Sequence, residues 1–116
     1  MSTRILLVDD EEGFRYATAK ALREAGFDVS DVSDHRGALN EISSDRDIDI
    51  LVTDVVMPNN VNGFALARMA RMKRPQIKVI YVTGYDVPMN EAEGTVLRKP
   101  LAASEVVAEV QRAVAA

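Results

Sequence analysis

Four polar features of this 116-residue chain have the residue types that phosphoryl or metal chemistry requires, and each closes a short apolar run. Asp9 and Asp10 follow "RILLV", Asp54 follows "IDILVT", Thr83 ends "KVIYVT" and Lys99 follows "TVLR". A carboxylate at the end of a buried run is unfavourable unless it is paired or binds a cation, because burial of a lone charge is costly. Asp54 is therefore either a turn cap at the sheet edge or part of a site built for a charge.

These groups would form a site for a divalent cation and a phosphoryl group if the fold brings them together. Three neighbouring carboxylates repel one another, and a hard ion such as Mg²⁺, which prefers carboxylate and carbonyl oxygens, removes that repulsion. A carboxylate beside Mg²⁺ is a nucleophile toward a phosphoryl group and yields an aspartyl phosphate. The Lys99 ammonium and the Thr83 hydroxyl are suited to the negative charge of the phosphoryl oxygens.

The rest of the sequence predicts the elements that position these groups. Apolar runs predict strands at 4–8, 27–33, 48–53, 78–83 and 95–98, and helical spacing predicts helices at 11–25, 35–44, 63–73 and 103–115. The strand at 27–33 is more polar and is expected near an edge. Continuous apolar strands that alternate with helices indicate an open five-stranded parallel α/β sheet with helices on both faces. Function in such sheets collects at the carboxyl ends of the strands.

Two of the predicted helices carry apolar stripes. The first is expected to face the sheet through Phe14, Ala17, Ala21, Leu22 and Ala25. The last carries Val106, Val107, Val110 and Val114. Its inner positions are expected in the core, and its alanine-rich surroundings leave either a monomer or a weak homodimer open.

Composition excludes several classes of protein. Acids outnumber bases 18 to 14, which gives a formal net charge of −4 and argues against a general nucleic-acid binder. The chain has no cysteine, so disulfides and thiolate metal sites are impossible. No apolar run is long enough to span a bilayer, and the N-terminus is too short for a signal peptide, so a cytoplasmic location is expected. The length predicts one domain over 1–116.

The segments "LLVDDE", "LVTDVVMP…G", "VIYVTG" and "LRKPL" resemble, in order and spacing, the receiver domain of bacterial response regulators, the CheY-like fold. The resemblance covers essentially the whole chain in a single-domain form. It implies a phosphoacceptor switch of a two-component phosphorelay rather than an enzyme. Asp54 would accept the phosphoryl group from a histidine kinase or histidine phosphotransfer protein, and an unknown downstream protein would read the result. Thr83 and Lys99 would contact the phosphoryl group, and the Lys99–Pro100 bond would be cis.

The same resemblance implies Mg²⁺ as cofactor. Asp10 would be a direct ligand and Asp9 would act largely through water, while Asp54 and the backbone carbonyl of Val56 would complete the protein ligands. The side chain of Val56 is apolar and cannot orient an attacking water by hydrogen bonding. Slow self-dephosphorylation is therefore expected.

The chain departs from the family pattern at three places. Val96 stands where most receivers have an aromatic residue, so the usual coupling of threonine to that ring cannot operate through it. Tyr81 and Tyr85 flank Thr83, and Tyr85 is the residue that we expect to substitute. Only 84–94 separate Thr83 from the next strand, so the fourth helix of the family is expected to be short or missing. The loop "MPNNVNG" is one residue longer than the common form.

Two other functions remain open at this stage. A pseudo-receiver would keep the fold but bind partners without phosphorylation, and Val96 with the short fourth-helix region favours it, whereas the three acids argue against it. A small Mg²⁺-dependent phosphohydrolase of the haloacid dehalogenase type needs a second acid two residues after the nucleophile. Val56 occupies that position, which disfavours this alternative.

Purely structural interpretations exist for the same residues. The acidic run that begins at Asp9 is also typical of a helix start, because acids favour the first turn. Thr83 is compatible with a simple strand residue, and Lys99 with a solvated charge. The basic run of Arg68, Arg71, Lys73 and Arg74 is expected to be a solvated helix face rather than a docking patch for a kinase.

Overall fold

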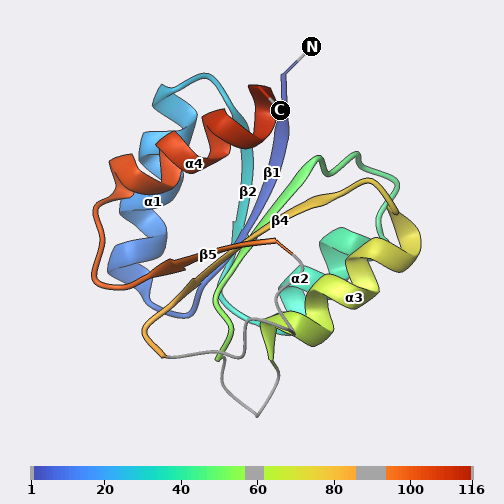
Figure 1. Ribbon diagram of the computed structural model, residues 1–116. Coiled ribbons are helices and arrows are strands. Elements are labelled where there is room, and N and C mark those ends of the chain that lie inside the picture. The colour runs from blue at the N-terminus through green and yellow to red at the C-terminus, as the bar shows by residue number, and fades with distance from the viewer. Residues whose placement is uncertain (1, 57–61, 86–93, 116) are drawn as a thin grey trace.

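The computed structural model describes residues 2–56, 62–85 and 94–115, which form a parallel sheet between two layers of helices (Figure 1). The strands are β1 (Arg4–Val8), β2 (Asp28–Val32), β3 (Ile50–Thr53), β4 (Lys78–Thr83) and β5 (Thr95–Arg98). The helices are α1 (Glu12–Glu24), α2 (His35–Ser43), α3 (Gly63–Lys73) and α4 (Ala103–Ala115). Every predicted element is present, and the bounds differ from the prediction by two residues at most.

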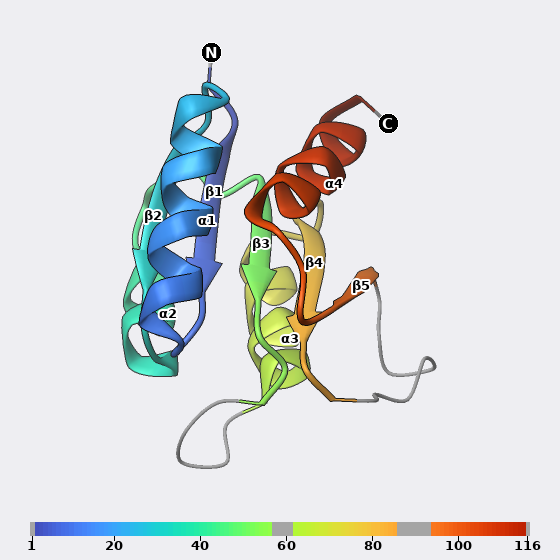
Figure 2. The ribbon, with the colours of Figure 1, turned by 90° about the vertical axis from the view of Figure 1, so that its left-hand side faces the viewer.

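The sheet has the order β2-β1-β3-β4-β5, and every neighbouring pair is parallel. Figure 2 shows the strands in this order from left to right, with their carboxyl ends at the bottom and with α1 and α4 in front. Helices α2 and α3 cover the other face (Figure 1). The predicted open five-stranded sheet and the edge position of β2 are confirmed. The predicted absence or shortness of a fourth helix concerns 86–93, and the longer loop concerns 57–61; both lie outside the described residues.

Both faces of the sheet are buried, which explains why the central strands are apolar without interruption. Leu6 and Leu51 pack on the side of α2 and α3, whereas Leu7 and Val52 pack on the side of α1 and α4. Side chains of a strand alternate between faces, so both alternate sets must be apolar when each face is covered. No helix in the described ranges is long and apolar enough to cross a membrane.

The predicted inner face of α1 is partly wrong. Ala17 and Ala25 are exposed, whereas Thr18, Ala19 and Leu22 are buried. Alanine offers one methyl group, so its burial contributes little and its position orients a helix only weakly. The valine stripe of α4 was assigned more accurately, since Val106 and Val110 are fully buried while Val114 is half exposed.

The basic end of α3 is not simply solvated, as had been expected. The Arg74 guanidinium donates to the carbonyls of Ile42, Ser44 and Arg46, and the Lys73 ammonium donates to those of Ser43 and Ser44. These carbonyls lie at the carboxyl end of α2, where helix carbonyls lack partners within the helix and attract cations. Two of the four basic residues therefore fasten α3 to α2.

Candidate functional site

The carboxyl edge of the sheet brings the two buried acids together. The parallel register pairs Val8 of β1 with Thr53 of β3, so that Asp9 and Asp54 follow at the same level of adjacent strands. The N–H of Asp54 also donates to the carbonyl of Val8 at 3.0 Å. The juxtaposition expected from strand topology is therefore a direct result of the register.

Asp10 joins these two residues in a cluster of three acids. Carboxylate oxygens of Asp9, Asp10 and Asp54 all lie within 4.8 Å of one another. Asp9 and Asp54 are 1% and 7% exposed, whereas Asp10 is exposed to solvent. Three hard oxygen donors, one of them open to water, are a suitable set for Mg²⁺, which prefers carboxylates and retains some of its water. The residues present therefore fit the expected cation.

Protonation of the two buried acids is governed by burial. The pKa of Asp54 is raised above its ordinary value because burial disfavours the carboxylate, and the charge of Lys99 offsets only part of this effect. The pKa of Asp9 is raised for the same reason, against a hydrogen bond from the N–H of Glu11 and the charge of Lys99. Keeping the carboxylates of Asp9 and Asp54 ionised therefore costs free energy, and a bound divalent cation would reduce that cost.

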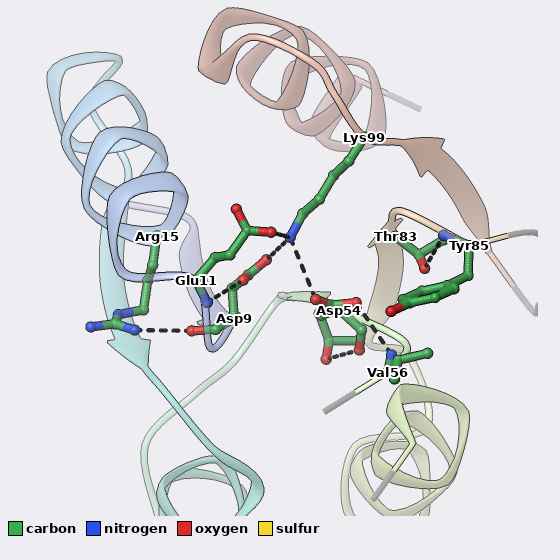
Figure 3. A network of polar contacts seen from close by, with 9 residues as sticks. Asp9, Glu11, Arg15, Asp54, Val56, Thr83, Tyr85 and Lys99 are labelled. Atoms are coloured by element: carbon green, nitrogen blue, oxygen red, sulfur yellow. Dashed lines mark hydrogen bonds and ion pairs between the residues drawn. The ribbon is translucent and has the colours of Figure 1, made fainter. Parts of the chain in front are cut away.

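Lys99 lies among the carboxylates, as Figure 3 shows. Its ammonium nitrogen is 2.9 Å from Asp9 Oδ2, 3.1 Å from Glu11 Oε1 and 3.4 Å from Asp54 Oδ2. It also lies 4.7 Å from the centre of the Phe14 ring, a cation–π contact. Burial works to lower the pKa of Lys99, but its hydrogen bonds to Asp9 and Glu11 and the nearby negative charges outweigh burial and raise it. Lys99 is therefore a fully charged ammonium.

The backbone that follows Asp54 is closed tightly around it. The N–H of Val56 donates to Asp54 Oδ1 at 3.2 Å, and Val56 forms an isolated bridge with Asn62. The N–H of Gly63 donates to the carbonyl of Val55 at 2.7 Å. This closure brings the first residue of α3 against Asp54. Coordination of a metal by the Val56 carbonyl stays a prediction.

Thr83 lies at the end of β4, beside the charged groups. It is fully buried, and the N–H of Lys99 donates to its carbonyl at 2.9 Å. Its hydroxyl oxygen accepts a hydrogen bond from the N–H of Tyr85 at 3.1 Å. Thr83 therefore connects the segment that carries Lys99 with the start of the segment that carries Tyr85. The Lys99–Pro100 bond is cis, as predicted.

The two tyrosines that flank Thr83 have different surroundings. Tyr81 is fully buried and packs edge to face on Phe64, with ring centres 4.9 Å apart. Tyr85 is 61% exposed. With Asp54 and Lys99 it lines an open cavity of about 660 Å³, and Figure 3 shows its ring on the side of Asp54. Of the two tyrosines, Tyr85 is therefore the one that borders the same cavity as Asp54.

Sequence reasoning missed the roles of Glu11 and Arg15 in this network. The Arg15 guanidinium donates to the backbone carbonyl of Asp9 at 3.0 Å and to Asp31 on β2 at 3.3 Å, and so ties the acidic turn to the sheet. The run of acids indicates a helix start, but no local pattern connects Glu11 with Lys99, which lies 88 residues later in the chain. The only available signal was that both residues adjoin strand ends at the same edge.

Comparison with known sequences gives a consistent result. Residues 5–111 match the family described as "Response regulator receiver domain". The response regulator receiver protein CpdR of Brucella abortus is 31% identical over 115 residues, which cover 94% of each chain. The sensor kinase CckA of the same organism is 40% identical over 86 residues, which cover 72% of this chain and 9% of that protein. The chain also spans half the length of the response regulator MprA of Mycobacterium tuberculosis.

Solved structures agree with the fold. A CheY-like receiver domain protein from Methanospirillum hungatei superimposes with a TM-score of 0.89 over 99% of this chain and 95% of its own, at 23% identity. The response regulator TrrA of Thermotoga maritima, solved in complex with Mg²⁺–BeF, is 27% identical and superimposes with a TM-score of 0.79. The shared regions cover 95% of this chain and 97% of TrrA.

Proposed function

This chain belongs to the response regulator receiver domain family, and on that premise we propose that 1–116 form one receiver domain whose Asp54 accepts a phosphoryl group in a Mg²⁺-dependent reaction. Phosphorylation would change the affinity of the domain for its partners. The observation that carries the proposal is the meeting of Asp9, Asp10, Asp54 and Lys99 at one edge of the sheet. Family membership makes the chain a receiver domain rather than a classical enzyme.

The residues of the site divide the work of phosphoryl transfer. The Asp54 carboxylate attacks phosphorus, an O–P bond forms, and the P–N bond to the donor histidine breaks as the imidazole leaves. The Val56 N–H holds one oxygen of Asp54 and so orients the nucleophile. Lys99 and the hydroxyl of Thr83 donate to the phosphoryl oxygens. Asp10, Asp54 and the Val56 carbonyl would hold Mg²⁺ directly and Asp9 would hold it through water, and the ion would supply positive charge to the same oxygens.

Receiver domains exchange phosphoryl groups with histidine kinases or phosphotransfer proteins, and we assign a partner of this kind to the chain. A downstream protein would recognise the phosphorylated form. We propose neither a nucleic acid nor a membrane as a partner, and we propose a cytoplasmic location. The domain would be a monomer or a weak homodimer. The acidic net charge of −4 supports the exclusion of nucleic acid.

Tyr85 is our candidate for the switch residue. Its N–H is bound to the Thr83 hydroxyl oxygen, so a Thr83 that turns toward a phosphoryl group alters the start of the segment that carries Tyr85. Val96, which packs half-buried against the core on the side of α2 and α3, has no ring to move. In this protein the change at Asp54 would therefore reach the surface through Tyr85.

The aspartyl phosphate should be long-lived. Val56 is 48% exposed beside the site and has no group that orients a water molecule. We expect the phosphoryl group to persist well beyond minutes without a partner, and Val56→Asn to shorten its half-life by about tenfold through water positioning. A time course of intact mass after removal of the donor measures both. Decay of the wild-type phosphate within minutes would contradict this expectation.

The direct test is intact mass after incubation with acetyl phosphate. A gain of one phosphoryl group by the wild type, lost in Asp54→Asn and without Mg²⁺, supports the proposal. If no gain occurs, binding of Mg²⁺ and of beryllofluoride decides whether the site is functional. Both require the same acids, but neither requires that acetyl phosphate be accepted as a donor. Failure of all three measurements would leave a pseudo-receiver that binds partners without phosphorylation.

A further inference from the structure

Glu11 contacts Lys99 without belonging to the proposed metal or phosphoryl site. Of the three carboxylates around the ammonium, Asp9 and Asp54 are buried members of the acid cluster. The side chain of Glu11 is 64% exposed and lies 3.1 Å from the ammonium. Figure 3 shows it reaching Lys99 from the start of α1, on the opposite side of the ammonium from Asp54.

The local structure of α1 gives a second reason to assign Glu11 a function. Glu11 is the N-cap residue of α1, yet its side chain makes no capping hydrogen bond. The N-caps of α2 and α3 are Asp34 and Asn62, and both accept a hydrogen bond from a backbone N–H of the first turn. Asp, Asn, Ser and Thr stabilise helices at this position, whereas the longer side chain of glutamate is not a preferred cap. Glu11 thus departs from the side-chain capping seen at α2 and α3, and its carboxylate is bound to Lys99 instead.

We propose that Glu11 competes with the phosphoryl group for Lys99 and thereby lowers the fraction of Asp54 that is phosphorylated at a given donor concentration. This inference rests on the proposed function, because it concerns the same lysine. The ammonium is bound by the carboxylates of Glu11, Asp9 and Asp54 together. A phosphoryl group on Asp54 places new negative charge beside the ammonium. The Glu11 carboxylate repels that charge and holds a hydrogen-bond donor that the phosphoryl oxygens need.

The size of the effect follows from the exposure of Glu11. Water and salt screen an exposed carboxylate, so its competition is modest compared with that of a buried ion pair. Neutralising Glu11 is expected to tighten binding of a phosphoryl mimic by about two- to fivefold, the upper part of the range measured for exposed ion pairs. Glu11 is therefore a residue that tunes the equilibrium of the switch, and it does not touch the reacting atoms.

The probe is beryllofluoride, titrated at saturating Mg²⁺ into wild type, Glu11→Gln, Glu11→Asp and Glu12→Gln. Glu12 is the matched control, because it is the neighbouring exposed acid of the same helix turn and makes no polar side-chain contact in the part of the chain that the structure describes. Glu11→Gln should bind the probe about two- to fivefold more tightly than wild type. Glu12→Gln should bind like wild type.

Glu11→Asp separates the contact with Lys99 from the stability of α1. Aspartate withdraws the carboxylate from Lys99 and is able to cap the helix, so tighter binding of the probe should accompany a higher melting temperature. Glu11→Gln should tighten binding without that gain in melting temperature. A change in helix stability alone cannot produce this pair of results.

Three outcomes would overturn the inference. Equal affinity in Glu11→Gln and Glu12→Gln would show that Glu11 does not compete, and weaker binding in Glu11→Gln would show that it assists. Wild-type affinity in Glu11→Asp would show that the contact is irrelevant. If the wild type binds no beryllofluoride in the presence of Mg²⁺, the proposed function itself is wrong. The wild-type titration alone distinguishes this outcome from a failure of the inference about Glu11.

Discussion

The backbone carbonyl of Asp54 occupies the space in which a side chain on Gly63 would begin, since a Cβ atom built on Gly63 would lie 2.2 Å from that oxygen. Real Cβ atoms do not approach an oxygen so closely, so a side chain here must move either the start of α3 or Asp54 itself. The identity of Gly63 is thus tied to the position of the phosphoacceptor, and not merely to a helix start.

Gly63→Ala is therefore expected to weaken both the fold and the site. Overpacking should lower the free energy of unfolding by about 1–3 kcal/mol, and the displaced Asp54 should bind beryllofluoride poorly. Urea unfolding and the beryllofluoride titration measure the two effects. Gly13→Ala is the control: a Cβ on Gly13 of α1 meets nothing within 4 Å, so the fold should gain about 0.5–1 kcal/mol in helix propensity. Unchanged binding of beryllofluoride by Gly63→Ala would mean that the start of α3 moves while Asp54 keeps its position.

Arg74 is expected to matter for stability but not for phosphorylation. Its guanidinium donates to the carbonyl of Ile42 in the last turn of α2 and to those of Ser44 and Arg46 just beyond it. Arg74→Ala leaves these acceptors with fewer donors and should lower the free energy of unfolding by about 1–3 kcal/mol. Arg68→Ala, on the exposed face of the same helix, should change it by less than about 0.5 kcal/mol. Equal losses in the two variants would show that the hydrogen bonds of Arg74 contribute nothing to stability.

The strands and the burial of the sheet on both faces were predictable because each central strand is a continuous apolar run. The acids, Thr83 and Lys99 could be assigned to one edge for a related reason, since parallel strands end together. Their placement required no knowledge of individual contacts. Only the topology and the ends of the runs entered the prediction.

The contacts that were missed arise from long side chains and from small residues. Glu11 and Arg15 reach other elements through flexible stems, and the direction of such stems is set by partners that are distant in sequence. Ala17 was wrongly placed inside because a single methyl group biases the rotation of a helix only slightly. Tyr85 could be singled out from its place two residues after Thr83, but its hydrogen bond to Thr83 and the cavity that it shares with Asp54 could not be predicted from the local sequence.

The burial of Asp54 predicts that the metal-free protein is more stable without this charge. Because the folded pKa lies above the ordinary value of 3.8, the folded protein retains a proton that the unfolded chain has already released. The free energy of unfolding therefore falls as the pH rises through that window, and the penalty is complete at neutral pH. Asp54→Asn removes it and should raise the free energy of unfolding at pH 7.

The comparison is made with a chelator present, by urea unfolding at several pH values. The pH slope of Asp54→Asn should be shallower than that of the wild type, although Asp9 retains a contribution of the same sign. Asp45→Asn, an exposed acid without polar contacts in the described ranges, should match the wild type. A less stable Asp54→Asn would show that its ion pair with Lys99 outweighs the cost of burial.

Among the described residues, Lys99 is the only one whose basic side chain is ion-paired with carboxylates of the acid cluster, so its removal should make folding depend on a divalent cation. In Lys99→Met the carboxylates of Asp9 and Asp54 are buried without a positive partner. Breaking a buried ion pair in this way costs about 3–5 kcal/mol. The cost should be smaller here, because one of the partners of Lys99 is the exposed carboxylate of Glu11.

Without Mg²⁺ the variant should melt well below the wild type. Saturating Mg²⁺ should raise the melting temperature of Lys99→Met more than that of the wild type, because the ion then neutralises charges that Lys99 no longer balances. Lys78→Met, at the opposite edge of the sheet, should show no such difference in its response to Mg²⁺. An equal Mg²⁺ response in wild type and Lys99→Met would mean that the ammonium and the cation act on the acids independently, and that Lys99 serves the phosphoryl group alone.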